Sequence, residues 1–279
     1  MKISKDVMEI KRVYRIENKD INVGFWYNSD GTPSGLAQKL GTTNKDMPMP
    51  YDKDKYTSHT GEPYICAAPS LEALLHWFGK EDFELLTREG FKLHLYEVIN
   101  CIEDGPQTLF LRSQVISDTI LSDEAMYGVK QVIVVRKDLI KGEHAVRRGK
   151  MMAQACHASL GSFLKWQTKE QVTTIPDGAF EPGQRYQRLH FEFMLGTPFD
   201  LWLNGLFTKV CVYVEGEKEL RALYELAQND ELFPIPIPCS LITDSGLTEF
   251  HGVPTVTCLG LGPWFSRDLD KLTGDLPLL

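Results

Sequence analysis

Apolar and polar positions change their spacing repeatedly along the second half of the chain, which indicates alternating strands and helices. The continuous apolar run from Val132 to Val135 predicts a strand that is buried on both faces. The further predicted elements, in chain order, are a helix at 149–167, a strand at 209–215, a helix at 217–230 and strands at 237–246 and 254–263. This order predicts a compact α/β domain with a mixed sheet, interrupted by a polar, irregular stretch at 168–207.

The first half of the chain has its own set of patterns. A stretch at 30–63 is rich in Gly, Thr, Asn and Pro, which is typical of a loop. SLEALLHWFG (70–79) predicts a helix that Ser70 caps, and residues 92–99 and 108–116 predict strands. We therefore expect two domains, an α+β domain at 1–125 and an α/β domain at 126–279.

The composition is that of a soluble globular protein, with 43% hydrophobic and 24% charged residues. No apolar stretch approaches the roughly 20 residues that cross a bilayer, and the start lacks the apolar core of a signal peptide. The six cysteines are scattered without a CxxC pair, which argues against a zinc site and a disulfide framework. We expect a reduced, cytoplasmic protein that makes no membrane contact.

The net charge of -8 is unevenly distributed. Residues 1–125 hold 14 Lys and Arg against 20 Asp and Glu, whereas residues 126–279 hold 16 against 18. Within the second part, residues 136–150 carry six Lys or Arg and only two acidic residues. Such a local basic patch is what phosphate binding requires, although a solvated surface loop would have the same composition.

Three polar residues of the helix at 149–167 have a spacing that places them on one face, namely Lys150, Gln154 and His157. Ala153, Ala158 and Leu160 are expected on the buried side. A cation, an amide and an imidazole near a helix N-terminus make a site for an anionic substrate. The alternative is an ordinary polar face, with His157 satisfied in the core.

A second candidate group lies in TDSGLTEF (243–250), directly after a predicted strand. Asp244 is well placed to hold a water or a hydroxyl, although aspartate is also common in turns. Thr248, Thr255 and Thr257 could hydrogen-bond nearby, although for threonines in strands a purely structural role is strongly favoured. The sequence has no GxSxG nucleophile motif, no phosphate-binding Walker loop and no HExxH metal motif.

The order of these motifs resembles the second, archaeal and eukaryotic type of peptidyl-tRNA hydrolase over about residues 129–279. The helix pattern GK-xxx-Q-xx-H and the closing TGDLPLL are distinctive, and WLNGLFTK and LTEFHGVPT are most similar to bacterial and phage members. The matching segments are VIVVRKDL, RRGKMMAQACHASLG, KVCVYVE, CSLITDSGLTEF, TVTCLGLGP and DLDKLTGDLPLL. The chain departs from the family in a longer loop before Lys150 and in the long stretch at 168–207.

The resemblance implies a four-stranded mixed sheet flanked by helices, an often dimeric protein and an active site without a cofactor. By position, the family's site residues fall on Lys150, Gln154, His157, Asp244, Thr248 and Thr257. The implied reaction is hydrolysis of the ester between a peptide and the 3′ ribose of tRNA. As a hypothesis, Asp244 positions or deprotonates the water, Lys150 neutralises the oxyanion or the terminal phosphate, and Gln154 and the threonines fix the substrate.

The implied partner is peptidyl-tRNA, and its phosphates are expected to contact Arg147 and Arg148, with Arg136 in the same basic patch. A protein that binds tRNA without hydrolysing it is the alternative.

The first 125 residues lie outside this family. Their motifs are ordered loosely like those of ADP-ribosyltransferase-like folds, which would make this part an NAD-binding module. The matching candidates are Arg15, Tyr27, Ser70 and Glu97. A structural or partner-binding module is the favoured alternative. A third possibility is that the acidic segment recruits a basic partner such as a ribosomal protein.

Overall fold

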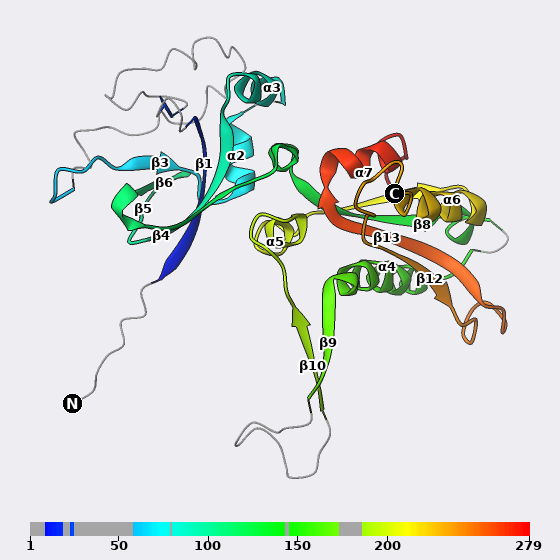
Figure 1. Cartoon of the computed structure of the whole chain (residues 1–279). Helices are drawn as coiled ribbons and strands as arrows, with labels where there is room; N and C mark the ends of the chain where they lie inside the picture. Colours follow the sequence, from blue (N-terminus) through cyan, green and yellow to red (C-terminus); the bar gives the residue numbers. More distant parts are fainter. Residues whose placement is uncertain (1–8, 19–22, 25–57, 79, 143–144, 173–185) are drawn as a thin grey trace. The chain divides into compact units, whose positions relative to one another are not determined.

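The computed structural model describes residues 9–18, 23–24, 58–78, 80–142, 145–172 and 186–279. The chain divides into two compact units, drawn in Figure 1. Unit 1 comprises residues 1–128 with 195–197 and 204–206, and unit 2 comprises residues 129–194, 198–203 and 207–279. None of the helices in these described ranges is long and apolar enough to cross a membrane.

Unit 1 contains two antiparallel sheets, one with the strand order β2-β1-β4-β7 and one with the order β3-β6-β5. Its strands are β1 (Ile10–Asn18), β2 (Val23–Gly24), β3 (Ile65–Ala67), β4 (Lys92–Ile99), β5 (Ile102–Asp104), β6 (Gln107–Phe110) and β7 (Val115–Ile120). Its helices are α2 (Leu71–Trp77), α3 (Lys80–Arg88) and the 3-10 turns η1 (Arg112–Gln114) and η2 (Asp123–Tyr127).

The predicted helix and the strand at 92–99 are confirmed in unit 1. Helix α2 begins after Ser70, whose hydroxyl accepts a hydrogen bond from the backbone N–H of Ala73 at 3.1 Å. The single strand predicted at 108–116 is wrong. The chain breaks there at η1, because β6 pairs with β3 and β5 whereas β7 pairs with β4 of the other sheet. Of the loop expected at 30–63, residues 30–57 lie outside the described residues.

Unit 2 is built on a four-stranded mixed sheet, as predicted, and its strand order is β11-β8-β13-β12. Strands β8 and β11 are parallel, and β13 runs antiparallel to both β8 and β12. The strands are β8 (Val129–Arg136), β9 (Gln167–Val172), β10 (Tyr186–Phe191), β11 (Lys209–Val214), β12 (Cys239–Asp244) and β13 (Thr255–Phe265). The helices are η3 (Lys137–Leu139), α4 (Arg148–Phe163), η4 (Leu164–Trp166), α5 (Pro198–Leu203), α6 (Glu217–Ala227) and α7 (Ser266–Thr273).

Helices cover both faces of this sheet, with α4 on one side and α6 and α7 on the other (Figure 1). Val132 and Val134 of β8 pack into the core formed with α6 and α7, and Ile133 and Val135 pack into the core formed with α4. Because alternate residues of a strand point to opposite faces, the continuous apolar run buries β8 on both sides.

Helix α4 lies directly on β13, and this close approach depends on Gly260. A Cβ at Gly260 would lie 2.1 Å from the carbonyl oxygen of Ala158. Only glycine therefore allows the helix to sit at this distance from the strand. The contact sets the position of α4 relative to the end of the sheet.

The chain's last residues cover the free edge of β11. The backbone N–H of Tyr213 donates to the carbonyl of Pro277 at 3.1 Å, and that of Leu279 donates to the carbonyl of Cys211 at 3.1 Å. An edge strand whose backbone groups are paired is protected from pairing with another chain. The closing TGDLPLL thus completes the sheet.

The irregular conformation expected for 168–207 is wrong for residues 168–172, 186–191 and 198–203, whereas residues 173–185 lie outside the described residues. Strands β9 and β10 form an antiparallel hairpin that projects from the end of α4 as a two-stranded arm, and α5 follows it (Figure 1). The base of the arm is held by aromatic packing, since the Phe191 ring lies 4.9 Å from that of Phe163 and 5.8 Å from that of Phe199. These aromatic contacts between distant residues have no periodic sequence pattern.

Candidate active site

Four elements of unit 2 bring polar side chains together at one end of the sheet. Helix α4 contributes Lys150 from its first turn and Gln154 from the next. Strand β12 ends at Asp244, the loop after it carries Thr248, and Thr257 lies on the neighbouring strand β13. The close packing of α4 on β13 places the two helix residues against the three from the strands and loop.

These five side chains form one connected hydrogen-bond network. The Nζ of Lys150 donates to Oδ2 of Asp244 and, at 2.9 Å, to Oγ1 of Thr248. Nε2 of Gln154 donates to the same oxygen of Asp244 at 2.8 Å. Oγ1 of Thr257 donates to Oε1 of Gln154 at 2.8 Å. The sequence predicted the membership of this group but not its connections.

Asp244 is the acceptor at the centre of the network. The hydrogen bond from Lys150 lowers the pKa of Asp244 below its ordinary value, and the backbone N–H of Gly246, at 2.9 Å, lowers it further. Gly246 has a φ of 82°, and a Cβ there would lie 2.5 Å from the carbonyl oxygen of Val253. A turn that only glycine fits therefore helps to keep Asp244 ionised at neutral pH.

The buried side of α4 differs from the one expected. Gln154 is only 3% exposed and lies on the buried stripe with Ala158, whereas Leu160 is 54% exposed. Ala153 is exposed as well, so the expectation that it faces the core is wrong. The hydrogen bonds of Gln154 to Asp244 and Thr257 hold its side chain on the buried face of α4. Ala153 and Leu160 therefore lie on the opposite, exposed face of the helix.

Of the six residues predicted to be catalytic, His157 is the one that lies outside the network. Its side chain is exposed on α4, and the described part of the chain shows no hydrogen bond or ion pair for it. The alternative that His157 is satisfied in the core is wrong, because the residue is at the surface.

The cations expected to bind phosphate have different surroundings. The side chain of Arg136 is 10% exposed and donates to Asp138, to Glu217 and to the carbonyl of Val256. Its contacts hold β8 to its neighbours, which favours a structural role. Arg148, in contrast, is exposed, and no partner for its side chain is found among the described residues.

Arg147 is paired with Glu249, a residue that the sequence patterns did not single out. The Nε of Arg147 donates to Oε1 of Glu249 at 2.8 Å, and its backbone N–H donates to Oε2 at 2.9 Å. The hydrogen bond from this backbone N–H lowers the pKa of Glu249. The only signal in the sequence was the position of Glu249 beside Thr248.

Comparison with known proteins agrees with this geometry. The family model of the peptidyl-tRNA hydrolase PTH2 matches residues 129–279, which include every member of the network. The chain belongs to the PTH2 family. The match begins with the first residue of β8 and ends with the last residue of the chain.

Several archaeal relatives of this PTH2 protein are named peptidyl-tRNA hydrolase. The protein from Methanopyrus kandleri is 39% identical over 150 residues, which are 54% of this chain and 97% of the relative. A Methanococcus maripaludis protein is 33% identical over 150 residues, 54% of this chain and 98% of the relative. The Methanocaldococcus jannaschii protein is 32% identical over 151 residues, 54% of this chain and all of the relative. Nearly the whole of each relative thus corresponds to the second half of this chain.

The first half of the PTH2 protein is similar to a different family. The family model of the bacteriophage T4 Y00F protein matches residues 5–124. This description states no activity, so it does not support an NAD-binding module.

The candidates for such a module do not converge in unit 1. Arg15 of β1 lies opposite His94 of β4, whereas Glu97 lies opposite Arg12, so Arg15 and Glu97 are on different faces of the sheet. Ser70 is used as the cap of α2, and Tyr27 lies outside the described residues.

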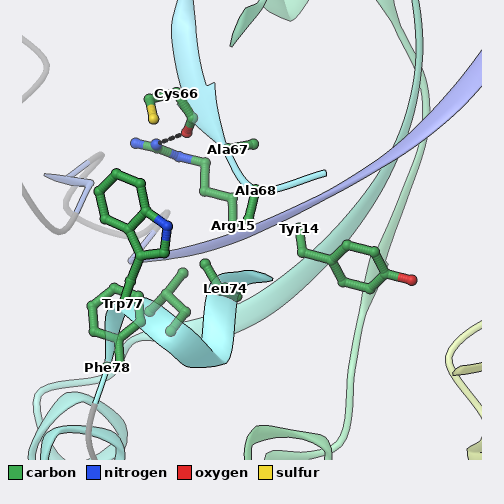
Figure 2. A pocket seen from close by; sticks show the side chains of 9 residues that line it. Tyr14, Arg15, Cys66, Ala67, Ala68, Leu74, Trp77 and Phe78 are labelled. Carbon is green, nitrogen blue, oxygen red and sulfur yellow. Dashed lines mark hydrogen bonds between the residues drawn. The ribbon is translucent and has the colours of Figure 1, made fainter. Parts of the chain in front are cut away.

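Arg15 lines a small pocket and donates to the backbone carbonyl of Cys66 at 2.5 Å (Figure 2). The pocket's other lining residues are largely apolar, namely Tyr14, Ile16, Ala67, Ala68, Leu74, Trp77 and Phe78. The Arg15 guanidinium is already engaged by the carbonyl of Cys66 and by Glu17, whose Oε2 accepts from its Nε at 2.7 Å. This arrangement does not support the NAD-site hypothesis.

Proposed function

We infer that unit 2 hydrolyses the ester bond between a peptide and tRNA. The observation that carries this inference is the cluster of Lys150, Asp244 and Thr248 in a member of the PTH2 family. The side chains of Lys150 and Asp244 are 15% and 10% exposed, so a substrate can reach them from solvent. In the reaction, water adds to the ester carbonyl and the bond to the 3′ oxygen breaks. The products are free tRNA, a peptide carboxylate and a proton.

Lys150 is the group that stabilises negative charge in this mechanism. Its Nζ is fixed by two oxygens from the strand end and the loop, so it need not reorganise when the tetrahedral oxyanion forms. Fixed electrostatic groups of this kind contribute about 10²–10³ in rate. The 3′-terminal phosphate of tRNA is a second anion within the reach of a cation at this position.

Asp244 holds the site in place and orients the water. A carboxylate whose pKa lies below its ordinary value is a weak general base at neutral pH. Of the two roles expected for Asp244, we therefore propose that it positions the water by a hydrogen bond and does not fully deprotonate it. Its charge also balances that of Lys150.

Gln154 and Thr257 act through Asp244 and not by touching the substrate. Both ends of the Gln154 amide are used within the protein, and the Thr257 side chain is fully buried. We propose that they set the orientation of the carboxylate, whereas Thr248, which is exposed, remains able to contact the substrate.

Arg148 is proposed as the main contact to the tRNA backbone. It is exposed in the first turn of α4, two residues before Lys150. Replacement of Arg148 by Ala is expected to weaken tRNA binding and to reduce its dependence on salt. An unchanged affinity and salt dependence would show that Arg148 is an ordinary surface charge.

Cleavage of peptidyl-tRNA by purified protein tests the proposed function. The wild-type protein is expected to turn over, and Lys150→Ala and Asp244→Asn are expected to lose about 10²-fold or more in kcat. Arg221→Ala is a matched control, because it removes an exposed arginine from an ion pair with Glu217 on α6, on the opposite face of the sheet from α4. Binding of tRNA without turnover by the wild-type protein would favour the non-catalytic alternative.

We also propose that the enzyme works in the cytoplasm beside the ribosome, with the acidic first 125 residues recruiting a basic partner. The support is their excess of acidic residues, 20 against 14 Lys and Arg. Co-sedimentation with ribosomes by the full chain, but not by residues 129–279, would agree with this. Equal sedimentation of the two proteins would remove the proposal.

A further inference from the structure

The loop that carries Thr248 is tied to the start of helix α4 by one acidic residue. Both carboxylate oxygens of Glu249 are bound by Arg147, one by its Nε and the other by its backbone N–H. The Glu249 side chain is 16% exposed, whereas that of Arg147 is 83% exposed. Glu249 of the loop is therefore the more buried partner, and the Arg147 side chain covers it on the solvent side.

The backbone N–H is the more important of the two donors. Arg147 is the N-cap residue of α4, but its own side chain makes no capping hydrogen bond to the helix. The first N–H groups of a helix lack partners within the helix, and a carboxylate is a strong acceptor for them. Glu249 thus caps α4 from a distant part of the chain.

This cap connects the helix that carries Lys150 with the loop that carries Thr248. Lys150 is three residues after Arg147 on the helix, and Thr248 is next to Glu249 on the loop. Lys150 and Thr248 are themselves in contact at 2.9 Å. A movement of the loop away from the helix start would separate Lys150 from Thr248, and an error of about 1 Å in such a position can cost 10²-fold in rate.

We propose that Glu249 is a positioning residue of this enzyme, which fixes Lys150 and Thr248 relative to each other by capping α4. The proposal rests on the proposed function of Lys150. It also changes the role of Arg147, which serves the cap and not the tRNA backbone.

The tests separate kcat from KM. Glu249→Ala is expected to lower kcat about tenfold with little change in KM, because the substrate-binding groups remain. Glu249→Gln retains an acceptor for the backbone N–H and is expected to restore most of kcat. Arg147→Ala keeps the backbone N–H bond and is expected to lower kcat by only about two- to threefold.

If Arg147 instead binds tRNA phosphates, the results would have the opposite pattern. Arg147→Ala would then raise KM and reduce the salt dependence of binding, and Glu249→Ala would lower KM by freeing the arginine. That pattern would overturn the proposal, as would an unchanged kcat in Glu249→Ala.

Amide hydrogen exchange provides a readout that does not depend on turnover. Exchange of the first turn of α4 is expected to increase in Glu249→Ala and less in Glu249→Gln, with the rest of unit 2 unchanged. Unchanged exchange in Glu249→Ala would refute the cap. Wild-type and Lys150→Ala proteins in the same activity assay show separately whether the proposed function fails.

Discussion

Replacement of Thr257 by Val tests whether the buried end of the network controls the reaction. Valine has nearly the shape of threonine and favours a strand, so only the hydroxyl is lost. That hydroxyl is fully buried and donates to Gln154 at 2.8 Å, with a longer contact of 3.3 Å to the carbonyl of Ile242. The change therefore leaves the side-chain oxygen of Gln154 without a donor in a buried site.

The expected magnitude follows from this loss. A buried acceptor without its partner costs about 1–3 kcal/mol of stability. Without this contact the Gln154 amide is no longer held in one orientation, which weakens the hydrogen bond that its Nε2 donates to Asp244. If about 1.4 kcal/mol of the positioning free energy is lost in the transition state, kcat falls about tenfold. KM is expected to change little, because neither residue touches the substrate.

The assay is steady-state cleavage of peptidyl-tRNA combined with urea unfolding, on Thr257→Val and on a control. Thr255→Val is the matched control, since Thr255 lies two residues earlier on β13. Among the residues that the structure describes, its exposed hydroxyl bonds only to the carbonyl of Val253, at 2.9 Å. The control is expected to keep its kcat and its stability to within about 0.5 kcal/mol. A less stable Thr257→Val protein with the kcat of the wild type would refute the reasoning, because the network would then be structural only.

Three further predictions concern the rest of the chain. A fragment of residues 129–279 should cleave peptidyl-tRNA as fast as the full chain, because the relatives correspond to this part alone; a large loss of kcat would give unit 1 a part in the reaction. The logarithm of tRNA affinity should fall with the logarithm of salt with a slope of about -2, not the roughly -5 that six free cations would give; a slope near -5 would contradict this. Burial alone would raise the pKa of Glu17, but Arg15 and Arg112 outweigh it and lower the pKa to about 2. A pKa that is lower in the folded state stabilises the protein at any pH above the pKa of the unfolded chain, near 4.5. About 3 kcal/mol of the free energy of unfolding should therefore be lost as the pH falls toward 2. Hydrogen exchange of β1 and β4 in wild-type and Glu17→Gln proteins measures this loss, and an equal acid response of the two would exclude Glu17 as its source.

The elements of unit 2 were largely predictable because each has a regular pattern. The apolar run at Val132–Val135 and the 3.6-residue spacing around Leu220 and Leu223 act locally, and the structure confirms both. The arm of β9 and β10 was missed because its strands pair with each other in a polar segment, without an apolar face to show the period. In unit 1, the break between β6 and β7 depends on which sheet each strand joins, which is not a local property.

The residues of the candidate site were predictable, but their roles were not. Spacing placed Lys150 and Gln154 on one helix face and could not show that Gln154 points inward toward Thr257. Glu249 was missed because its partner lies 102 residues earlier, and no motif links the two. Contacts between distant residues decide which polar group faces the substrate and which one holds its neighbour.

The free charge of the basic patch at 136–150 also depends on contacts between distant residues, which the sequence does not show. This free charge determines how the enzyme attracts tRNA. Most of its cations already have carboxylate partners, namely Arg136 with Asp138 and Glu217, Lys137 with Glu215, Arg147 with Glu249 and Lys150 with Asp244. Among the described residues, only Lys141 and Arg148 of this patch show no such partner. The salt dependence of binding grows with the number of cations that are free to contact phosphates, because each such contact releases counterions. We therefore expect the patch to contribute about two phosphate contacts and not six. With a net charge of -8 on the chain, long-range attraction to tRNA is weak. Recognition must then depend on short-range contacts near the first turn of α4, where Arg148 lies two residues before Lys150.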